Sequence, residues 1–244
     1  MKPFLLLQLR PEDEAADEEY TAFLRNGGLT DDRIIRVRLD QTGLPDGFDL
    51  NSVAGVIVGG GPGCVSDPPE KKSPVEAQVE RAVLAIMPEI CERDLPFLGC
   101  CYGLGVLVAH LGGAMGQGRF GEPVGGVDCA MTPEAASDPL TEGLPQQFRA
   151  LVGHKEAVER MPTGAVLLAG SEPCPVQMVR YKKNVYATQF HPEADGESFV
   201  TRIRIYRDRG YFPPEEADAL SAACRAEKVT VPEEILRRFV GRYG

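Results

Sequence analysis

The chain has 244 residues, of which 43% are hydrophobic, and this fits one globular α/β domain with a sizeable core. Its 36 acidic and 26 basic residues give a net charge of −10, which would repel a phosphate backbone, and no clustered basic face offsets it. Nucleic acid is therefore excluded as an expected partner. The apolar run at the N-terminus is too short for a membrane span or a secretory signal, so we expect a cytoplasmic protein that binds no membrane.

The cysteines and histidines do not form a recognisable framework. Seven cysteines, an odd number at irregular spacings, argue against a set of disulfides. The chain has no Cys-x-x-Cys pair and only three histidines, so a four-ligand zinc site would need ligands from distant positions. The sequence therefore predicts neither a metal site nor a cofactor.

Apolar runs and amphipathic segments alternate through the first half of the chain. Strands are predicted over residues 3–9, 32–39, 53–60 and 95–100, and helices over residues 12–28, 73–94 and 102–113. This alternation predicts an open, mostly parallel, twisted sheet with helices on both faces. In such folds the ligand site lies beyond the carboxyl ends of the strands, where the glycine-rich turns "GGGPG" and "GCCYG" both fall.

Shorter strands and then helices follow in the second half. Strands are predicted over residues 125–132, 147–153, 164–171, 175–181 and 184–190, as an antiparallel or mixed continuation of the sheet, and helices over 196–210, 213–227 and 231–244. Residues 1–200 are assigned to one domain and residues 201–244 to a C-terminal helical extension packed on it. Packing of the last helices against a neighbouring subunit of a homo-oligomer stays open.

The adjacent cysteines of "LPFLGCCYGLG" raise the question of which thiol is chemically useful. A nucleophile on a tight strand-to-helix turn needs small residues two positions before and after it, and only Cys101 is flanked in this way, by Gly99 and Gly103. The helix that follows directs its N-terminal amides at Cys101 and favours the thiolate, and the amide of Tyr102 is placed to bind an oxyanion. A buried structural cysteine in a glycine-rich turn is the competing interpretation for this motif alone.

A base for this nucleophile is available in "ATQFHPEADG". Residues two apart in an extended chain share a face, so His191 and Glu193 project together. Glu193 can accept a hydrogen bond from one imidazole nitrogen and leave the other nitrogen to take the proton of Cys101. The combination of thiol, imidazole and carboxylate indicates nucleophilic catalysis.

At this point the chain resembles the class I, triad-type glutamine amidotransferases, which have a flavodoxin-like fold. The resemblance rests on three motifs in the family's order: "GGGPG" at residues 59–63, "PFLGCCYGLG…LGG", and "QFHPE" at residues 189–193. It covers about the first 200 residues. It implies a catalytic triad of Cys101, His191 and Glu193 and an oxyanion hole formed by the backbone amides of Gly61 and Tyr102.

Other substrate contacts are implied by the same resemblance. It places Gly60 of the glycine-rich loop, and Gly153 and His154 of "LVGHKEAV", against the substrate. One position departs from the family, because Gly105 stands where a glutamine side chain helps to hold the substrate. The sequence suggests that this volume is empty, and that another residue replaces the contact, the fit is looser, or glutamine is not the substrate.

The resemblance implies hydrolysis of the side-chain amide of L-glutamine through a cysteinyl thioester, with release of ammonia. Within the family the chain most resembles the amidotransferase portion of GMP synthetase. It lacks the Ser-Gly-Gly-x-Asp-Ser loop of the ATP-pyrophosphatase half, so the ammonia acceptor would be activated on a separate synthase subunit. Two alternatives are retained, a γ-glutamyl hydrolase or peptidase on the same fold and an inactive interaction module.

Overall fold

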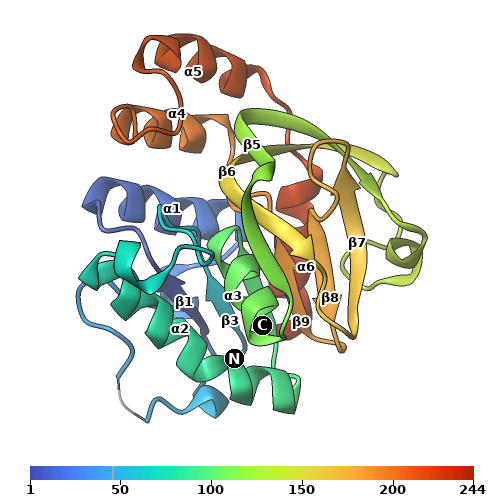
Figure 1. Ribbon diagram of the computed structural model, residues 1–244. Coiled ribbons are helices and arrows are strands. Elements are labelled where there is room, and N and C mark those ends of the chain that lie inside the picture. Colours follow the sequence, from blue (N-terminus) through green and yellow to red (C-terminus); the bar gives the residue numbers. More distant parts are fainter. Residues whose placement is uncertain (46) are drawn as a thin grey trace.

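A single nine-stranded sheet organises the part of the chain that the structure, a computed structural model, describes, namely residues 1–45 and 47–244 (Figure 1). The strand order is β2-β1-β3-β4-β9-β8-β7-β5-β6. The parallel half consists of β2 (Ile34–Arg38), β1 (Phe4–Gln8), β3 (Val56–Val58), β4 (Phe97–Cys100) and β9 (Val185–Thr188). The antiparallel half consists of β8 (Met178–Tyr181), β7 (Ala165–Ser171), β5 (Ala114–Met131) and β6 (Gln147–Arg160).

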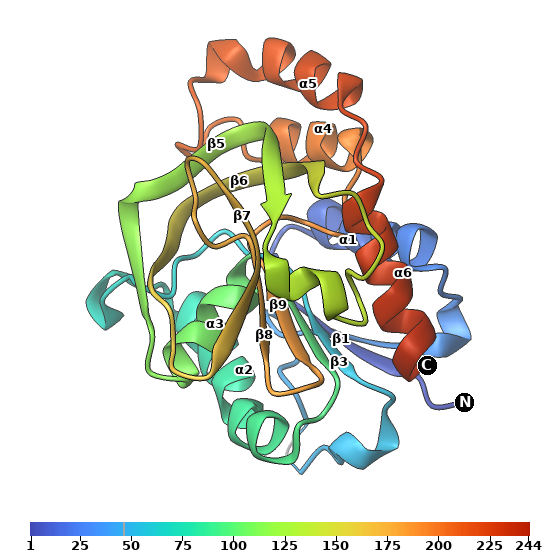
Figure 2. The ribbon, with the colours of Figure 1, turned by 90° about the vertical axis from the view of Figure 1, so that its right-hand side faces the viewer.

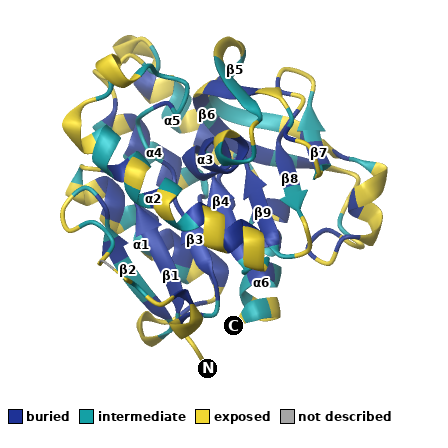
Figure 3. Cartoon of the chain, turned by 60° about the horizontal axis from the view of Figure 1, so that its bottom comes forward, coloured by how far each residue is buried: buried dark blue, intermediate teal, exposed yellow. Residues whose placement is uncertain are grey.

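Helices cover both faces of the parallel half. Helices α2 (Pro74–Arg93) and α3 (Tyr102–His110) lie on one face, and α1 (Asp13–Gly27) and α6 (Val231–Tyr243) lie on the other (Figure 2). The central strands are therefore dark blue throughout in Figure 3, while the outer helices show exposed sides. Continuous apolar strands such as "FLLLQ" are expected where both faces of a sheet are covered.

Local signals set the bounds of two of these helices. Ser73 caps α2 by accepting the amide of Glu76, whose side chain in turn accepts the amide of Ser73, and Pro74 occupies the first helical position. Helix α1 ends at Gly27 and is capped by Gly28, which adopts a left-handed conformation with φ 66°. Both signals are present in the sequence, which explains why these helices were predictable.

The C-terminal helices pack at two different places. The ring of Phe239 on α6 lies 5.9 Å from the ring of Phe4 on β1, inside the core between α1 and the sheet. Helices α4 (Gly196–Ile205) and α5 (Ala217–Ala226) pack together in a smaller apolar cluster with Leu151 of β6. The boundary between residues 200 and 201 stays a prediction, although α6 shares the core of the sheet.

The predicted α/β architecture, a large sheet flanked by helices, is confirmed. Two details differ from the sequence prediction. Parallel pairing is limited to the five strands from β2 to β9, and β5 and β6 are much longer than predicted, forming an irregular hairpin with register shifts between Ala114 and Gly125. Glycines at positions 116, 118 and 121 concealed the first part of β5. In the described residues, no helix is both long and apolar enough to cross a membrane.

Candidate active site

Cys101 lies on a sharp turn between β4 and α3, with a positive φ of 53°. This conformation is strained for a residue other than glycine and is typical of a nucleophile on a strand-to-helix turn. The turn requires both flanking glycines, because a Cβ on Gly99 would lie 2.7 Å from the backbone of Gly103, and a Cβ on Gly103 would lie 3.1 Å from the carbonyl oxygen of Val58. The two glycines that flank Cys101 in the sequence therefore have a steric cause.

The two adjacent cysteines have different surroundings. Cys100 is fully buried in the apolar cluster that contains Leu98 and Phe4, whereas Cys101 is partly exposed. The backbone amide of Cys101 donates to the carbonyl of Thr188, 2.7 Å away, at the end of the neighbouring strand β9. The register of β4 against β9 thus brings Cys101 to the same edge of the sheet as the "QFHPE" segment.

His191 and Glu193 form a buried hydrogen-bonded pair. The Nδ1 atom of His191 lies 2.8 Å from Oε1 of Glu193, so the Nε2 atom is left for another partner. Burial lowers the pKa of His191, and the charge of Glu193 opposes this effect. Burial alone would raise the pKa of Glu193, but the charges of His191 and Arg202 and the hydrogen bond with His191 lower it. Glu193 is therefore ionised and can orient the imidazole.

Cys101 and His191 line one cavity of about 50 Å³, together with Gly61 and Gly153. Burial raises the pKa of the Cys101 thiol to about 12, although Arg10 opposes the shift. Burial thus acts against the helix N-terminus, which the sequence suggested would favour the thiolate. Gln189 places its Nε2 atom 3.9 Å from the sulfur and can donate to a developing thiolate. Ionisation of this thiol requires a base, and the imidazole of His191, the predicted base, lines the same cavity.

The glycine-rich loop contributes two neighbouring residues in different ways. Gly61 lines the cavity of Cys101. The other residue of the predicted oxyanion hole, Tyr102, lies in the first turn of α3, where its backbone amide has no acceptor inside the helix. The amide of Gly60 instead donates to Glu19, 3.2 Å away. A Cβ at Gly60 would lie 2.6 Å from Cε1 of His191, so glycine at this position makes room for the imidazole. Gly60 therefore contacts the predicted base, and its substrate contact stays a prediction.

The segment with Gly153 and His154 forms a wall of a second small cavity beside Cys101. The side chain of His154 is buried, with Nδ1 2.8 Å from the carbonyl oxygen of Glu156 and Nε2 2.8 Å from the carboxylate of Glu122. Both ring nitrogens are thus occupied, so a contact of His154 with a substrate would have to use its backbone.

One group of side chains in the described residues has the spacing of metal ligands. The ligand atoms of Glu122, His154 and Cys174 lie within 4.8 Å of one another. Glu122 also accepts hydrogen bonds from Gln177 and Ser171, and burial raises the pKa of the Cys174 thiol to about 12. This is a hydrogen-bonded network with a protonated thiol, and its effect is to fix β5, β6 and β7 behind the wall of the site.

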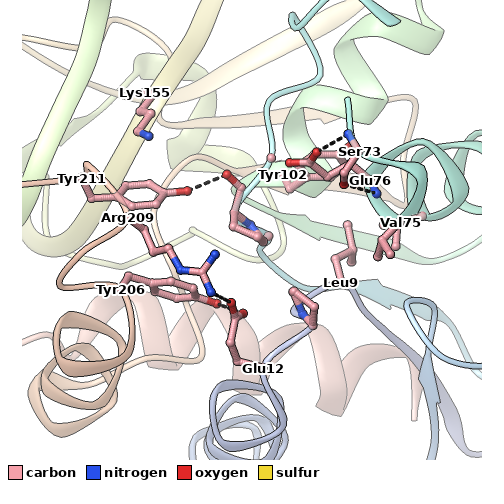
Figure 4. A pocket seen from close by; sticks show the side chains of 15 residues that line it. Leu9, Glu12, Ser73, Val75, Glu76, Tyr102, Lys155, Tyr206, Arg209 and Tyr211 are labelled. Carbon is pink, nitrogen blue, oxygen red and sulfur yellow. Dashed lines mark hydrogen bonds and ion pairs between the residues drawn. The ribbon is translucent and has the colours of Figure 1, made fainter. Parts of the chain in front are cut away.

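The segment between α4 and α5 covers the cavity of Cys101. Tyr211 donates a hydrogen bond to the carbonyl of Pro62, 2.6 Å away, and the ammonium of Lys155 lies 4.2 Å from the centre of its ring (Figure 4). Phe212 also lines the cavity. A volume of about 50 Å³ holds a few water molecules, which is less than a ligand of the size of glutamine occupies.

A larger cavity of about 450 Å³, with Tyr206, Tyr211 and Glu12 among its lining residues, is drawn in Figure 4. It shares Gly61 and Tyr211 with the cavity of Cys101. Tyr206 stands between the two cavities, where its hydroxyl donates to Glu12 and accepts from Arg10. Of the two predicted oxyanion residues, Gly61 lines both of these cavities, whereas Tyr102 lines the larger one and the second small cavity beside Cys101.

The family model for class-I glutamine amidotransferases matches residues 32–204 of the chain. The chain belongs to this family. The matched region begins just before β2 and ends within α4, so it includes the glycine-rich loop, the Cys101 turn and the "QFHPE" segment. The cover formed by Tyr211 and Phe212 lies beyond it.

Relatives within the amidotransferase family include GMP synthases. The chain is 35% identical over 160 residues to the GMP synthase [glutamine-hydrolyzing] of Thermosipho africanus, covering 64% of this chain and 27% of that protein. It is 28% identical over 160 residues to a GMP synthase [glutamine-hydrolyzing] subunit of Archaeoglobus fulgidus, covering 65% and 75%. A glutamine amidotransferase structure from Thermotoga maritima has a TM-score of 0.72 at 19% identity, covering 98% and 99%. The chain thus spans about a quarter of the bacterial GMP synthase that it matches.

The space beside Gly105, which the sequence suggested to be vacant, is filled in this amidotransferase. A Cβ at Gly105 would lie 3.0 Å from Cγ2 of Val65 and 3.1 Å from Oε1 of Glu156. The Glu156 carboxylate is fixed there by the backbone amides of Val65 and Ser66, both at 2.9 Å. Glu156, from a distant strand, thus takes the place that a side chain at position 105 would need, and it also lines the smaller cavity beside Cys101.

Gly105→Gln is therefore expected to destabilise the protein and to leave the Michaelis constant for glutamine unchanged or higher. The new side chain would overpack the site and displace Glu156, at a cost of about 1–3 kcal/mol. Thermal unfolding and steady-state kinetics measure the two effects, and Gly105→Gln combined with Glu156→Ala, which makes room, should recover part of the stability. A stable single variant with a lower Michaelis constant would show that the glutamine side chain can still reach the substrate.

Sequence reasoning missed Arg10, Arg202 and Tyr211, which all line the cavity of Cys101. Arg10 follows β1 closely, at the edge of the sheet where ligands bind, so its position was a usable signal. Arg202 and Tyr211 belong to a helix and a connecting segment whose fold against the site depends on long-range packing, and the sequence contained no local sign of it.

Proposed function

We propose that the chain hydrolyses the side-chain amide of L-glutamine through a thioester on Cys101 and releases ammonia. The observation that carries this proposal is the shared cavity of Cys101 and His191, with the imidazole hydrogen-bonded to the buried carboxylate of Glu193. Membership of the class-I glutamine amidotransferase family supports the choice of substrate.

In the proposed mechanism, His191 accepts the proton of Cys101 and the sulfur attacks the amide carbon of glutamine. The backbone amides of Gly61 and Tyr102 stabilise the resulting oxyanion. His191 then donates its proton to the nitrogen as the carbon–nitrogen bond breaks, so ammonia leaves and a glutamyl thioester remains. Water, which gives a proton to His191, attacks the thioester, and glutamate and the free thiol are released.

The released ammonia would serve an acceptor whose activation takes place on a separate synthase subunit. This proposal rests on relatives such as the GMP synthase subunits from Archaeoglobus fulgidus and from Thermococcus kodakarensis. We therefore propose a GMP synthase-like role for this chain.

Ammonia release from glutamine tests the activity directly. The purified chain should release ammonia and glutamate in equal amounts, and the rate should rise when the synthase partner from the same source is added. The small volume beside Cys101 predicts a slow basal rate, because lining residues such as Tyr211 and Phe212 must shift to make room for glutamine. Absence of ammonia release with and without the partner would refute the proposal.

A second candidate function, hydrolysis of γ-glutamyl amides or peptides, is favoured by the cavity of about 450 Å³ beside Gly61 and Tyr102. This volume could hold a leaving group much larger than ammonia. The same thioester chemistry would apply, with an amine in place of ammonia. A panel of γ-glutamyl amides separates the two functions, because a kcat/KM that exceeds the value for glutamine would identify the larger substrate.

A further inference from the structure

Arg202, on helix α4, contacts the carboxylate that orients the predicted base. Its Nη2 atom lies 2.9 Å from Oε1 of Glu193, the same oxygen that lies 2.8 Å from Nδ1 of His191. Arg202 is 6% exposed and Glu193 is fully buried. One carboxylate oxygen therefore joins a guanidinium and an imidazole in a setting where charge interactions are strong.

The aromatic ring of Phe199 packs against both partners of Glu193, the guanidinium of Arg202 and the imidazole of His191. The guanidinium of Arg202 lies 5.5 Å from the centre of this ring, and the ring of His191 packs edge-on against it at 5.7 Å. The other contact of Arg202 is Glu18 on α1, at 3.5 Å, while its Nε and Nη1 atoms are buried without a hydrogen-bond partner among the described residues. The hydrogen bond to Glu193 is thus the strongest polar contact of this side chain.

We propose that Arg202 is a positioning residue that acts through Glu193, holding the carboxylate in the orientation that presents His191 to Cys101. The proposal rests on the proposed function, since positioning matters for a base that takes a proton. The positive charge of Arg202 also opposes the effect of the Glu193 charge on His191, which favours the neutral imidazole that can accept the thiol proton.

The charged groups around His191 determine the direction in which its pKa should change when Arg202 is replaced. Glu193 raises the pKa of His191, whereas Arg202 and Arg10 lower it, beyond the lowering caused by burial itself. Glu19 is paired with Arg10, and Cys101, neutral at rest, lies in the same cavity. Removal of the Arg202 charge should therefore raise the pKa of His191, so that a higher pH is needed to obtain the neutral base.

Three variants test the role of the guanidinium. Arg202→Met removes the charge with little change in length, Arg202→Lys keeps the charge without the planar fork, and Arg204→Met is the matched control. Arg204 lies on the same helix but is exposed and pairs with Glu14. Arg202→Met should lower turnover of glutamine by about tenfold to hundredfold, the lysine variant should recover part of it, and Arg204→Met should behave as the wild type.

The pH dependence separates positioning from simple support of the fold. The acidic limb of kcat/KM should move to higher pH in Arg202→Met and stay in place in Arg204→Met. In a Glu193→Gln background, Arg202→Met should cost little further turnover, because the residue through which it acts is already changed. Arg202→Gln, which keeps a donor for Glu193 but not the charge, replaces the methionine variant if that variant does not fold.

Nuclear magnetic resonance of the imidazole ring gives a readout that needs no activity. The chain has only three histidines, so the titration of His191 can be followed in the full protein without substrate. A higher pKa of His191 in Arg202→Met than in Arg204→Met supports the proposal even if glutamine proves not to be the substrate. The same pKa in both variants, or a loss of turnover in Arg202→Met with the acidic limb unmoved, would overturn it.

Discussion

Alanine at position 101 is expected to abolish ammonia release from glutamine, whereas alanine at position 100 should leave turnover nearly unchanged. Cys101 lines the cavity that His191 also lines, and no covalent intermediate can form without its sulfur. Cys100 packs against Leu98 in the core, so its truncation should cost about 1 kcal/mol of stability, or slightly more. The two adjacent substitutions are thus matched in chemistry and opposite in expected effect, with activity and thermal unfolding as the measurements.

Labelling provides an independent check of the same assignment. A chloroketone analogue of glutamine should modify one cysteine, and peptide mapping should place the adduct on Cys101. Five of the other thiols are buried away from the cavity of Cys101, and burial raises the pKa of Cys64, on the glycine-rich loop, to about 12 as it does for Cys101. Cys101 shares its cavity with His191, and Cys64 does not. An adduct on Cys64 or Cys100 would therefore show that His191 does not direct the reaction.

The turn at Cys101 and the "QFHPE" segment were predictable because their geometry is local. Gly99 and Gly103 make room for close backbone approaches, and such approaches leave glycine at fixed offsets in the sequence. His191 and Glu193 are two residues apart, so an extended backbone already places both side chains on one face. Parallel pairing of β4 with β9 then brings the two segments to one edge. The sequence predicted a strand over residues 184–190, in an antiparallel or mixed continuation of the sheet, but did not predict its pairing with β4.

The surroundings of the predicted triad were not predictable in the same way. The surface that faces Gly105 is made by Glu156, and position 156 was not even predicted to lie in a strand, because the glycines at 116–121 and 153 interrupted the pattern of β5 and β6. Arg202 meets Glu193 only after α4 folds back over the sheet edge. Contacts of this kind depend on how segments distant in the sequence pack together, and local sequence patterns do not predict that packing.

Glutamine at position 193 is expected to lower turnover by about 10- to 1000-fold, less than the loss of Cys101. The amide can still accept the hydrogen bond from Nδ1 of His191, but it cannot stabilise the imidazolium that forms when Cys101 loses its proton. Glu193 raises the pKa of His191, so its neutralisation should move the acidic limb of kcat/KM to lower pH. This shift is opposite to the one expected for Arg202→Met, although both variants break the same ion pair.

The stability of Glu193→Gln provides the last discriminating measurement. Removal of one partner from a buried ion pair costs about 3–5 kcal/mol when the other charge is left unpaired. Arg202 keeps Glu18 at 3.5 Å, so we expect the lower end of that range, and a second substitution of Arg202→Met should restore part of the stability without restoring turnover. Glu197→Gln is the control, because Glu197 is exposed and pairs with Arg225. Turnover equal to the wild type in Glu193→Gln would mean that Cys101 and His191 act as a dyad and that the buried carboxylate only anchors α4.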